Sequence, residues 1–279
     1  MGAVGNVQLQ ILTISVQYFM KAKSYSLLLG ALLGLSSCEK VIDVDLRDTD
    51  TKTVIEGNIT DQAGPYTVRV SQTANFNESG TGQTLDNATV LITDNTGQRD
   101  TLRGVGNGLY QTRTLRGTPG RAYTLSVTVG GKLYTATSTM PQPVVLDKLT
   151  YEDAGPGSKA IYAHFDDPAN AINQYRFVMW INDKRQDAIF ISDDRLRNGI
   201  RNRIALFSPG ASADEVEPND NVRVEMQGID AGVYDYFKSL SDLLGGQSAS
   251  PANPNTNLSG GAVGYFSAQT VSTNSLLVK

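Results

Sequence analysis

The chain has 279 residues and carries 24 lysines and arginines against 28 aspartates and glutamates, which gives a net charge of −4. This mildly acidic balance, without a basic segment interleaved with aromatic residues, argues against a nucleic-acid partner. A single cysteine excludes an intramolecular disulfide, so the stability must come from the burial of apolar side chains.

A short apolar segment near the N-terminus has the features of a lipoprotein signal peptide. Lys21 and Lys23 precede an apolar run over residues 27–35, which is shorter than the roughly 20 residues that span a bilayer. The run ends in the lipobox pattern Leu35, Ser36, Ser37 and Cys38. We therefore predict a signal peptide over residues 1–37. The alternative is a secreted protein whose only cysteine follows an apolar run by chance.

Cys38 is the predicted site of lipid attachment. A diacylglyceryl group would alkylate its thiol, and the amine freed by cleavage would then be acylated. One acyl chain binds a membrane marginally, at about 0.8 kcal/mol per buried CH₂, whereas two or more anchor a protein firmly. Residues 1–19 precede Met20 and are interpreted as an over-long gene start or, alternatively, as a long n-region of the signal. Residues 38–51 are expected to form a tether.

Short strands separated by turn signals dominate residues 52–140. The expected strands cover residues 54–60, 66–71, 88–94, 98–102, 106–110, 122–129 and 132–139. Gly130 and Gly131 lie between the last two and are typical of a two-residue hairpin turn. This pattern, without a helix, predicts an N-terminal antiparallel β-sandwich, immunoglobulin-like or transthyretin-like. Pro141 and Pro143 mark its end, because proline cannot continue a central strand.

A second β-rich domain is predicted over residues 144–279. Its candidate strands cover residues 146–151, 159–165, 174–182, 187–191, 204–207, 221–229 and 262–268. One helix is expected over residues 231–244, with Asp230 as its N-cap and Gly245 as its C-terminal cap. Its apolar positions follow helical spacing on one face: Val233, Tyr236, Phe237, Leu240, Leu243 and Leu244. The fold class is therefore mainly β with one packed helix.

Several separate motifs give the chain a family resemblance. They are the lipobox running into residues 38–46, Val54-Ile55-Glu56-Gly57, Gly64-Pro65-Tyr66-Thr67-Val68, Gly106-Asn107-Gly108-Leu109-Tyr110, Pro119-Gly120, Tyr134-Thr135-Ala136, Pro251-Ala252-Asn253-Pro254, Asn257-Leu258 and Gly264-Tyr265-Phe266. In this order they resemble the DUF4249 lipoproteins of Bacteroidota. The resemblance implies an outer-membrane lipoprotein of unassigned biochemical function, whose relatives tend to be encoded beside TonB-dependent transporters. It supplies no catalytic residues.

The sequence offers little for catalysis. His164 is the only histidine, and it lies in a strand-like run. A Ser-His-Asp triad would have to use it, yet the chain contains no Gly-x-Ser-x-Gly elbow. A zinc site normally needs several histidine or cysteine ligands. We therefore expect a structural or exposed strand position for His164, no cofactor and no catalytic residue.

Adjacent carboxylates are the other possible source of chemistry. Three groups stand out: Asp166-Asp167, Asp193-Asp194 and Asp214-Glu215-Val216-Glu217. In principle they supply an acid/base pair for hydrolysis or ligands for Ca²⁺. None has the spacing of a calcium-binding loop, and neighbouring acids at strand ends are usually solvated turn residues. We therefore expect solvated positions, with calcium binding and hydrolysis as the alternatives.

Two further motifs have both a structural and a functional interpretation. Trp180 lies in a run that is apolar on both faces, which favours core packing over an exposed ring for stacking on sugars. Asp100-Thr101-Leu102 matches the loose Asp-Ser/Thr-apolar pattern of bacteroidal O-glycosylation.

Taken together, these features predict a lipid-anchored outer-membrane lipoprotein, a non-catalytic accessory or ligand-binding component that acts with a TonB-dependent transporter. The long loops over residues 75–87 and 250–261 are candidates for contacts. Glu39, Lys40, Asp43 and Asp45 loosely resemble surface-export signals, so a position facing the cell surface is favoured over the periplasm. The alternatives are an envelope hydrolase that uses an acidic pair, and a structural or adhesive envelope protein.

Overall fold

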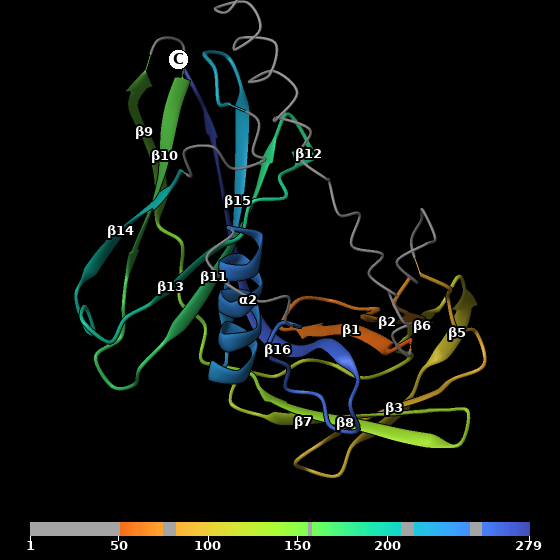
Figure 1. Cartoon of the computed structure of the whole chain (residues 1–279). Coiled ribbons are helices and arrows are strands. Elements are labelled where there is room, and N and C mark those ends of the chain that lie inside the picture. The colour runs from red at the N-terminus through yellow and green to blue at the C-terminus, as the bar shows by residue number, and fades with distance from the viewer. Residues whose placement is uncertain (1–50, 75–81, 156–157, 208–214, 246–252) are drawn as a thin grey trace, which may run out of the picture. The chain divides into compact units, whose positions relative to one another are not determined.

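The computed structural model describes residues 51–74, 82–155, 158–207, 215–245 and 253–279 (Figure 1). The predicted signal peptide, lipobox, Cys38 and almost all of the tether lie outside these residues, as do parts of both long loops.

The first hydrophobic core lies between two sheets. One contains β1 (Thr53–Thr60), β2 (Thr67–Gln72), β6 (Leu109–Gln111) and β5 (Arg103–Gly106), hydrogen-bonded in that order. The other contains β4 (Arg99–Thr101), β3 (Thr89–Asp94), β7 (Ala122–Val129) and β8 (Lys132–Thr139). Alternate side chains of the longer strands point inward, as in Ile55 and Ile59 of β1 and Leu125 and Val127 of β7.

A second core lies between a further pair of sheet regions. On one side are β9 (Lys148–Gly155), β10 (Ser158–Asp166) and β14 (Arg201–Leu206). On the other are β11 (Gln174–Ile181) and β15 (Asn221–Ile229), with the short strands β12 (Lys184–Arg185) and β13 (Phe190–Asp193) on β11. Phe165 and Tyr175 meet inside this core, with ring centroids 4.7 Å apart.

Strand β16 (Val263–Leu277) joins the strands β1, β2, β6 and β5 of the first core to the strands β15, β11, β12 and β13 of the second in one nine-stranded sheet (Figure 1). Its residues 263–269 pair in parallel with β1, and its residues 270–277 pair antiparallel with β15. Gly264 permits the close approach to β1, because its φ is +104° and an added Cβ would lie 2.1 Å from the carbonyl oxygen of Ile55. The last strand therefore connects the two halves of the described chain.

Helix α2 (Ala231–Leu244) begins where the sequence predicts it. Asp230 caps it, because one carboxylate oxygen accepts the Val233 N–H at 2.9 Å. The other oxygen accepts the Ser138 hydroxyl and the Thr139 N–H, so the cap also ties the helix to β8. The inward face of the helix buries Val233, Tyr236 and Phe237.

The mainly β fold class with one helix is confirmed for the described residues, and β7, β8 and β15 have the expected bounds. All strand pairs within residues 52–140 are antiparallel, as predicted. The prediction did not include β16, which comes from the end of the chain and pairs in parallel with β1. The final strand was expected to end at residue 268, but it continues to Leu277. Strands β5 and β12 were not predicted, because they are short and all of their residues are exposed.

Candidate functional site

Three neighbouring hollows cross the outer side of the sheet that contains β16, β1, β2 and β6. Their cavity volumes are about 590, 390 and 290 Å³. Gln111 lines both the first and the second hollow, whereas Glu56 and Tyr265 line both the second and the third. We call this row of adjacent hollows the sheet-face groove, and its three parts the arginine hollow, the middle hollow and the aromatic hollow.

The aromatic hollow lies where helix α2 meets β16 and β11. Tyr236 and Phe237 of the helix and Tyr265 of β16 form a ring cluster with centroid separations of 4.9 to 5.1 Å. The guanidinium carbon of Arg176 lies 4.0 Å from the centroid of the Phe237 ring. The helical spacing of the sequence placed Tyr236 and Phe237 on one face, but nothing local connected them to Arg176 or Tyr265.

Arg176 brings a positive charge into this hollow. Its Nη1 donates to the Gln227 side-chain oxygen at 3.0 Å, and Gln227 in turn donates to Glu225 at 2.6 Å. No carboxylate among the described residues forms an ion pair with Arg176. Burial is the main reason that the pKa of this guanidinium is lowered from its ordinary value. A partly desolvated arginine without a direct counter-charge is well suited to bind an anionic or strongly polar ligand group.

The two tyrosine hydroxyls of the aromatic hollow are neutral at physiological pH. Burial, with the nearby charge of Glu56 and the neighbouring Tyr265, raises the pKa of Tyr236 to about 12. Burial also raises the pKa of Tyr265. Neither hydroxyl makes a hydrogen bond to another part of the chain that the structure describes. Both are therefore available to donate to a ligand.

The middle hollow is built by strand register. Tyr265, Glu56, Arg69 and Leu109 stand opposite one another on β16, β1, β2 and β6, so they form one row across the sheet. Glu56 and Arg69 are exposed, whereas the side chains that alternate with them along the strands are buried. The sequence showed the alternation but not which strands would lie side by side.

The arginine hollow lies at the far edge of the same face. Arg103 at the start of β5 and Arg113 and Arg116 in the loop after β6 line it, and no acidic residue does. All three arginine side chains are exposed. Sequence analysis did not single them out, because they are not consecutive in the chain.

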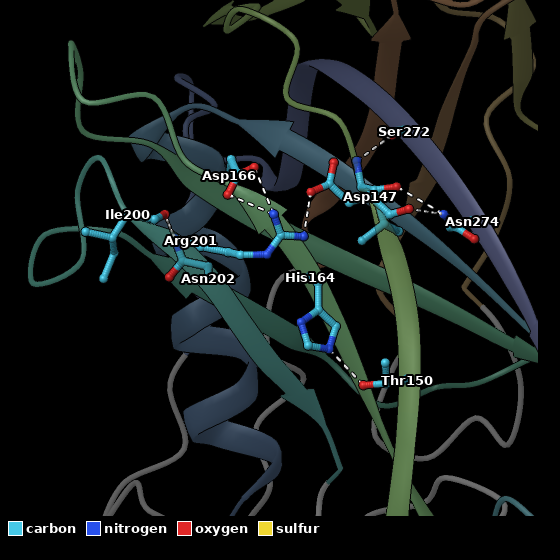
Figure 2. A network of polar contacts seen from close by, with 10 residues as sticks. Asp147, Thr150, His164, Asp166, Ile200, Arg201, Asn202, Ser272 and Asn274 are labelled. Atoms are coloured by element: carbon cyan, nitrogen blue, oxygen red, sulfur yellow. Dashed lines mark hydrogen bonds and ion pairs between the residues drawn. The ribbon is translucent and has the colours of Figure 1, made fainter.

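Asp166, one of the predicted carboxylates, lies in a surface ion-pair network (Figure 2). Arg201 binds the carboxylates of both Asp166, at 3.0 Å, and Asp147, at 2.8 Å. The neighbouring Asn274 of β16 donates to the carbonyl oxygens of Leu146 and Asp147, as Figure 2 shows. This network joins β9, β10 and β14 to β16, which is a structural role.

His164 lies on β10 near this network and its Nε2 is 2.7 Å from the Thr150 hydroxyl (Figure 2). Burial, followed by the positive charges of Lys148 and Arg203, lowers its pKa, so the ring is neutral at pH 7. The contacts of His164 therefore fit the structural strand position that the sequence predicts.

Two of the predicted carboxylates, Asp167 and Asp194, meet inside the second core region. Asp167 is 6% exposed and accepts hydrogen bonds from the Tyr175 hydroxyl and the Gly199 N–H. Asp194 is 1% exposed and accepts the Asn173 N–H at 2.9 Å. Burial, together with the hydrogen-bonding contact to Asp167, raises the pKa of Asp194. The expectation of solvated positions is wrong for this pair, because loops distant in sequence fold over both residues.

The remaining acidic candidates lie near the surface. Asp193 is paired with Arg195 at 2.6 Å. Glu215 and Glu217 are exposed, and Asp214 lies outside the described residues. Within the described ranges, no group of three or more metal-ligating side chains comes together.

Trp180 occupies a different environment from the predicted core position. Its side chain is half-buried, and the guanidinium carbon of Arg223 lies 3.9 Å from the ring centroid. Tyr175, Phe177 and Met179 take the core-facing side of β11 instead. The prediction was wrong because an apolar run does not show that the partner strand carries an arginine directly opposite the ring.

Asp100 of the glycosylation-like motif has a clear structural role. It is 4% exposed, and one of its oxygens accepts the backbone N–H groups of Arg113, Thr114 and Leu115 at 2.7 to 2.8 Å. Thr101 beside it is exposed. The carboxylate therefore holds the loop that forms the arginine hollow.

The fold and the groove define a β-sandwich protein with a charged and aromatic depression on the open face of one sheet. Residues 39–275 match the family model described as a domain of unknown function (DUF4249), and the chain belongs to this family. Among solved structures, a segment of two fibronectin type-III domains from chicken tenascin is similar at 12% identity and a TM-score of 0.21. That similarity covers 64% of this chain and 91% of the tenascin segment. A comparison with curated proteins finds no match.

Proposed function

We propose that this protein is a lipid-anchored, non-catalytic binding protein of the outer membrane that acts as an accessory to a TonB-dependent transporter. The observation that carries the binding role is the sheet-face groove. It combines exposed charges, neutral tyrosine hydroxyls and a half-buried arginine without a direct counter-ion. Ligand sites typically combine apolar or aromatic walls with a few polar groups in this way.

The sequence supports the anchoring part of the proposal. The lipobox Leu35, Ser36 and Ser37 leads directly to Cys38, the proposed lipidation site. No helix of the described ranges is long and apolar enough to cross a membrane. A tether raises the effective concentration of the binding domain at the membrane, so even a weak interface with a transporter would be occupied. The transporter itself is proposed from the family resemblance.

The alternative of an envelope hydrolase has one observation in its favour, the contact between Asp167 and Asp194. However, both carboxyl groups are almost completely buried, and neither lines any of the three hollows. A general acid must be within hydrogen-bond reach of its substrate. The geometry therefore favours a structural role for this pair.

A pull-down of the tagged, lipidated chain from native membranes in mild detergent tests the accessory role. We expect a TonB-dependent transporter to be recovered in near-stoichiometric amount, and protease shaving of intact cells to digest the protein at the surface. Recovery of the lone protein would contradict the proposal. So would hydrolysis of a glycan or peptide library that is lost on Asp194→Asn but kept in the matched control Asp193→Asn.

A further inference from the structure

The arginine hollow has an unusual charge distribution for an acidic protein. Arg103, Arg113 and Arg116 converge on one depression of about 590 Å³ that no carboxylate lines. Within the described part of the chain, none of these three side chains makes a hydrogen bond or an ion pair. Other arginines of the protein do pair with carboxylates at 2.5 to 2.8 Å, as Arg121 does with Asp94 and Arg203 with Glu152.

The backbone at Arg113 is fixed by hydrogen bonds to a buried carboxylate. The buried Asp100 accepts three successive N–H groups, from Arg113 to Leu115, so this turn of the loop is fixed. Burial alone would raise the pKa of Asp100, but these N–H groups outweigh burial and lower it. Asp100 is therefore ionised, and its Oδ2 is occupied by the backbone. Its charge interacts with Arg113, but it forms no ion pair with the Arg113 side chain, so in the described part of the chain the guanidinium groups keep their N–H donors for another partner.

Both ends of the loop are also fixed, through hydrogen bonds to Tyr66. The Tyr66 N–H donates to the Thr112 hydroxyl at 2.9 Å, and the Tyr66 hydroxyl accepts the Gly117 N–H at 3.0 Å. Arg113 and Arg116 thus project from a loop that is bonded on both sides. A site whose loop is already ordered loses less conformational freedom on binding.

We infer that the arginine hollow binds a tetrahedral oxyanion, a phosphate or sulfate ester carried by a larger molecule. Arginine presents a planar fork of N–H donors that matches phosphate and sulfate oxygens, and several arginines together balance the negative charge of such a group. Gln111 connects this hollow to the middle hollow, so the rest of an esterified molecule has room along the sheet-face groove. This inference adds a ligand class to the proposed binding role.

Calorimetric titration of the purified chain at low ionic strength tests whether the arginine hollow binds such anions. The probes are pyrophosphate, glucose 6-phosphate and glucose 6-sulfate. We expect the double variant Arg113→Gln/Arg116→Gln to weaken binding at least tenfold. The exposed Arg99, which does not line the hollow, provides a control with Arg99→Gln, and we expect its affinity to match the unmodified chain. Binding should weaken as salt is added, because exposed charges are screened.

Vesicles that contain phosphatidylglycerol distinguish a lipid headgroup from a soluble ester. Co-sedimentation that is lost in the double variant, without binding of the soluble esters, would identify the headgroup as the source of the same phosphate chemistry. An unmodified chain that binds neither the soluble probes nor the vesicles, or a folded double variant that binds them unchanged, would overturn the inference. Since no transporter is needed, failure here is distinguishable from failure of the pull-down.

Discussion

Asp194 lies next to Asp167 in the second core region, and this neighbouring carboxyl group contributes, after burial, to the raised pKa of Asp194. Oδ1 of Asp194 has no hydrogen-bond partner in the described part of the chain. A proton on this oxygen, donated to Asp167, satisfies both groups and removes the repulsion between two negative charges. The raised pKa of Asp194 agrees with this arrangement.

The first prediction concerns the dependence of stability on pH. Because the folded state raises the pKa of Asp194 above its ordinary value of 3.8, the folded chain keeps a proton that the unfolded chain releases. The contribution of Asp194 to stability is thus complete below pH 3.8 and is lost as pH rises through the folded pKa. Asp194→Asn mimics the protonated carboxyl group, so we expect the variant to gain stability relative to the unmodified chain between pH 4 and 7.

Thermal unfolding across this pH range measures the difference. Asp193→Asn, which changes the neighbouring surface carboxylate, is the control and should not show this gain with pH. A constant difference between Asp194→Asn and the unmodified chain at every pH would show that no proton is shared.

The second prediction concerns Asp100. Three N–H groups donate to its carboxylate, and together they lower its pKa although burial opposes this. Its contribution to stability is present above its unfolded pKa of about 3.8 and is lost as pH falls through the folded pKa. We expect Asp100→Asn to cost about 1–3 kcal/mol at pH 7, because hydrogen bonds to a charged group are replaced by weaker ones.

Urea unfolding at pH 7 and at acidic pH checks this value. Glu152→Gln is a matched control, since it removes an exposed carboxylate whose surface ion pair with Arg203 is expected to contribute little to stability. If Asp100→Asn and Glu152→Gln lost the same free energy of unfolding, the role given to Asp100 would be refuted.

The third prediction concerns the pairing of β16 with β1. In Gly264→Ala, the new Cβ would meet the Ile55 carbonyl oxygen at 2.1 Å, and φ would remain unfavourable at +104°. We expect a loss of about 3 kcal/mol or more, because backbone cannot move as easily as the end of a side chain. Gly261→Ala is the control: its φ is +80° but no atom lies within 4 Å. Gly261→Ala should lower the free energy of unfolding, measured with urea, by only about 1 kcal/mol.

The fourth prediction concerns the single tryptophan. The Arg223 guanidinium covers the ring of Trp180, with 3.9 Å between its carbon and the ring centroid. Arg223→Ala should therefore increase quenching of Trp180 fluorescence by acrylamide, at a cost in stability of about 0.5–1 kcal/mol. Arg69→Ala removes an arginine from another sheet position and should leave quenching unchanged. Unchanged quenching in Arg223→Ala would contradict the stacked arrangement.

The fifth prediction concerns the anchor. Cys38→Ala removes the thiol to which a diacylglyceryl group would be attached, so incorporation of labelled palmitate should be abolished. The variant should keep its signal peptide or become soluble. Membrane partitioning that does not change in Cys38→Ala would rule out lipid anchoring at this residue.

Local patterns were sufficient to predict most of the elements. The bounds of β7, β8, β15 and α2 follow from periodicity and from caps such as Asp230, because these signals depend on neighbours within a few residues. The lipobox is likewise a local signal. By contrast, Trp180 was placed incorrectly, because its environment depends on the strand beside it.

The sheet-face groove could be recognised only from the tertiary structure. Glu56 and Tyr265 share a row only because β16 returns to lie parallel to β1, and the arginine hollow forms only where the loop after β6 meets Arg103. Asp167 and Asp194 were both noticed in the sequence as members of acidic pairs. Their contact could not be predicted, because it requires two loops that are distant in sequence to fold against each other. The sequence by itself determined most of the strands and the helix, and it predicts the anchor, since these depend on short-range periodicity and motifs. Only the tertiary structure decided which charges face one another, because strand order and register arise from contacts between residues far apart in the chain.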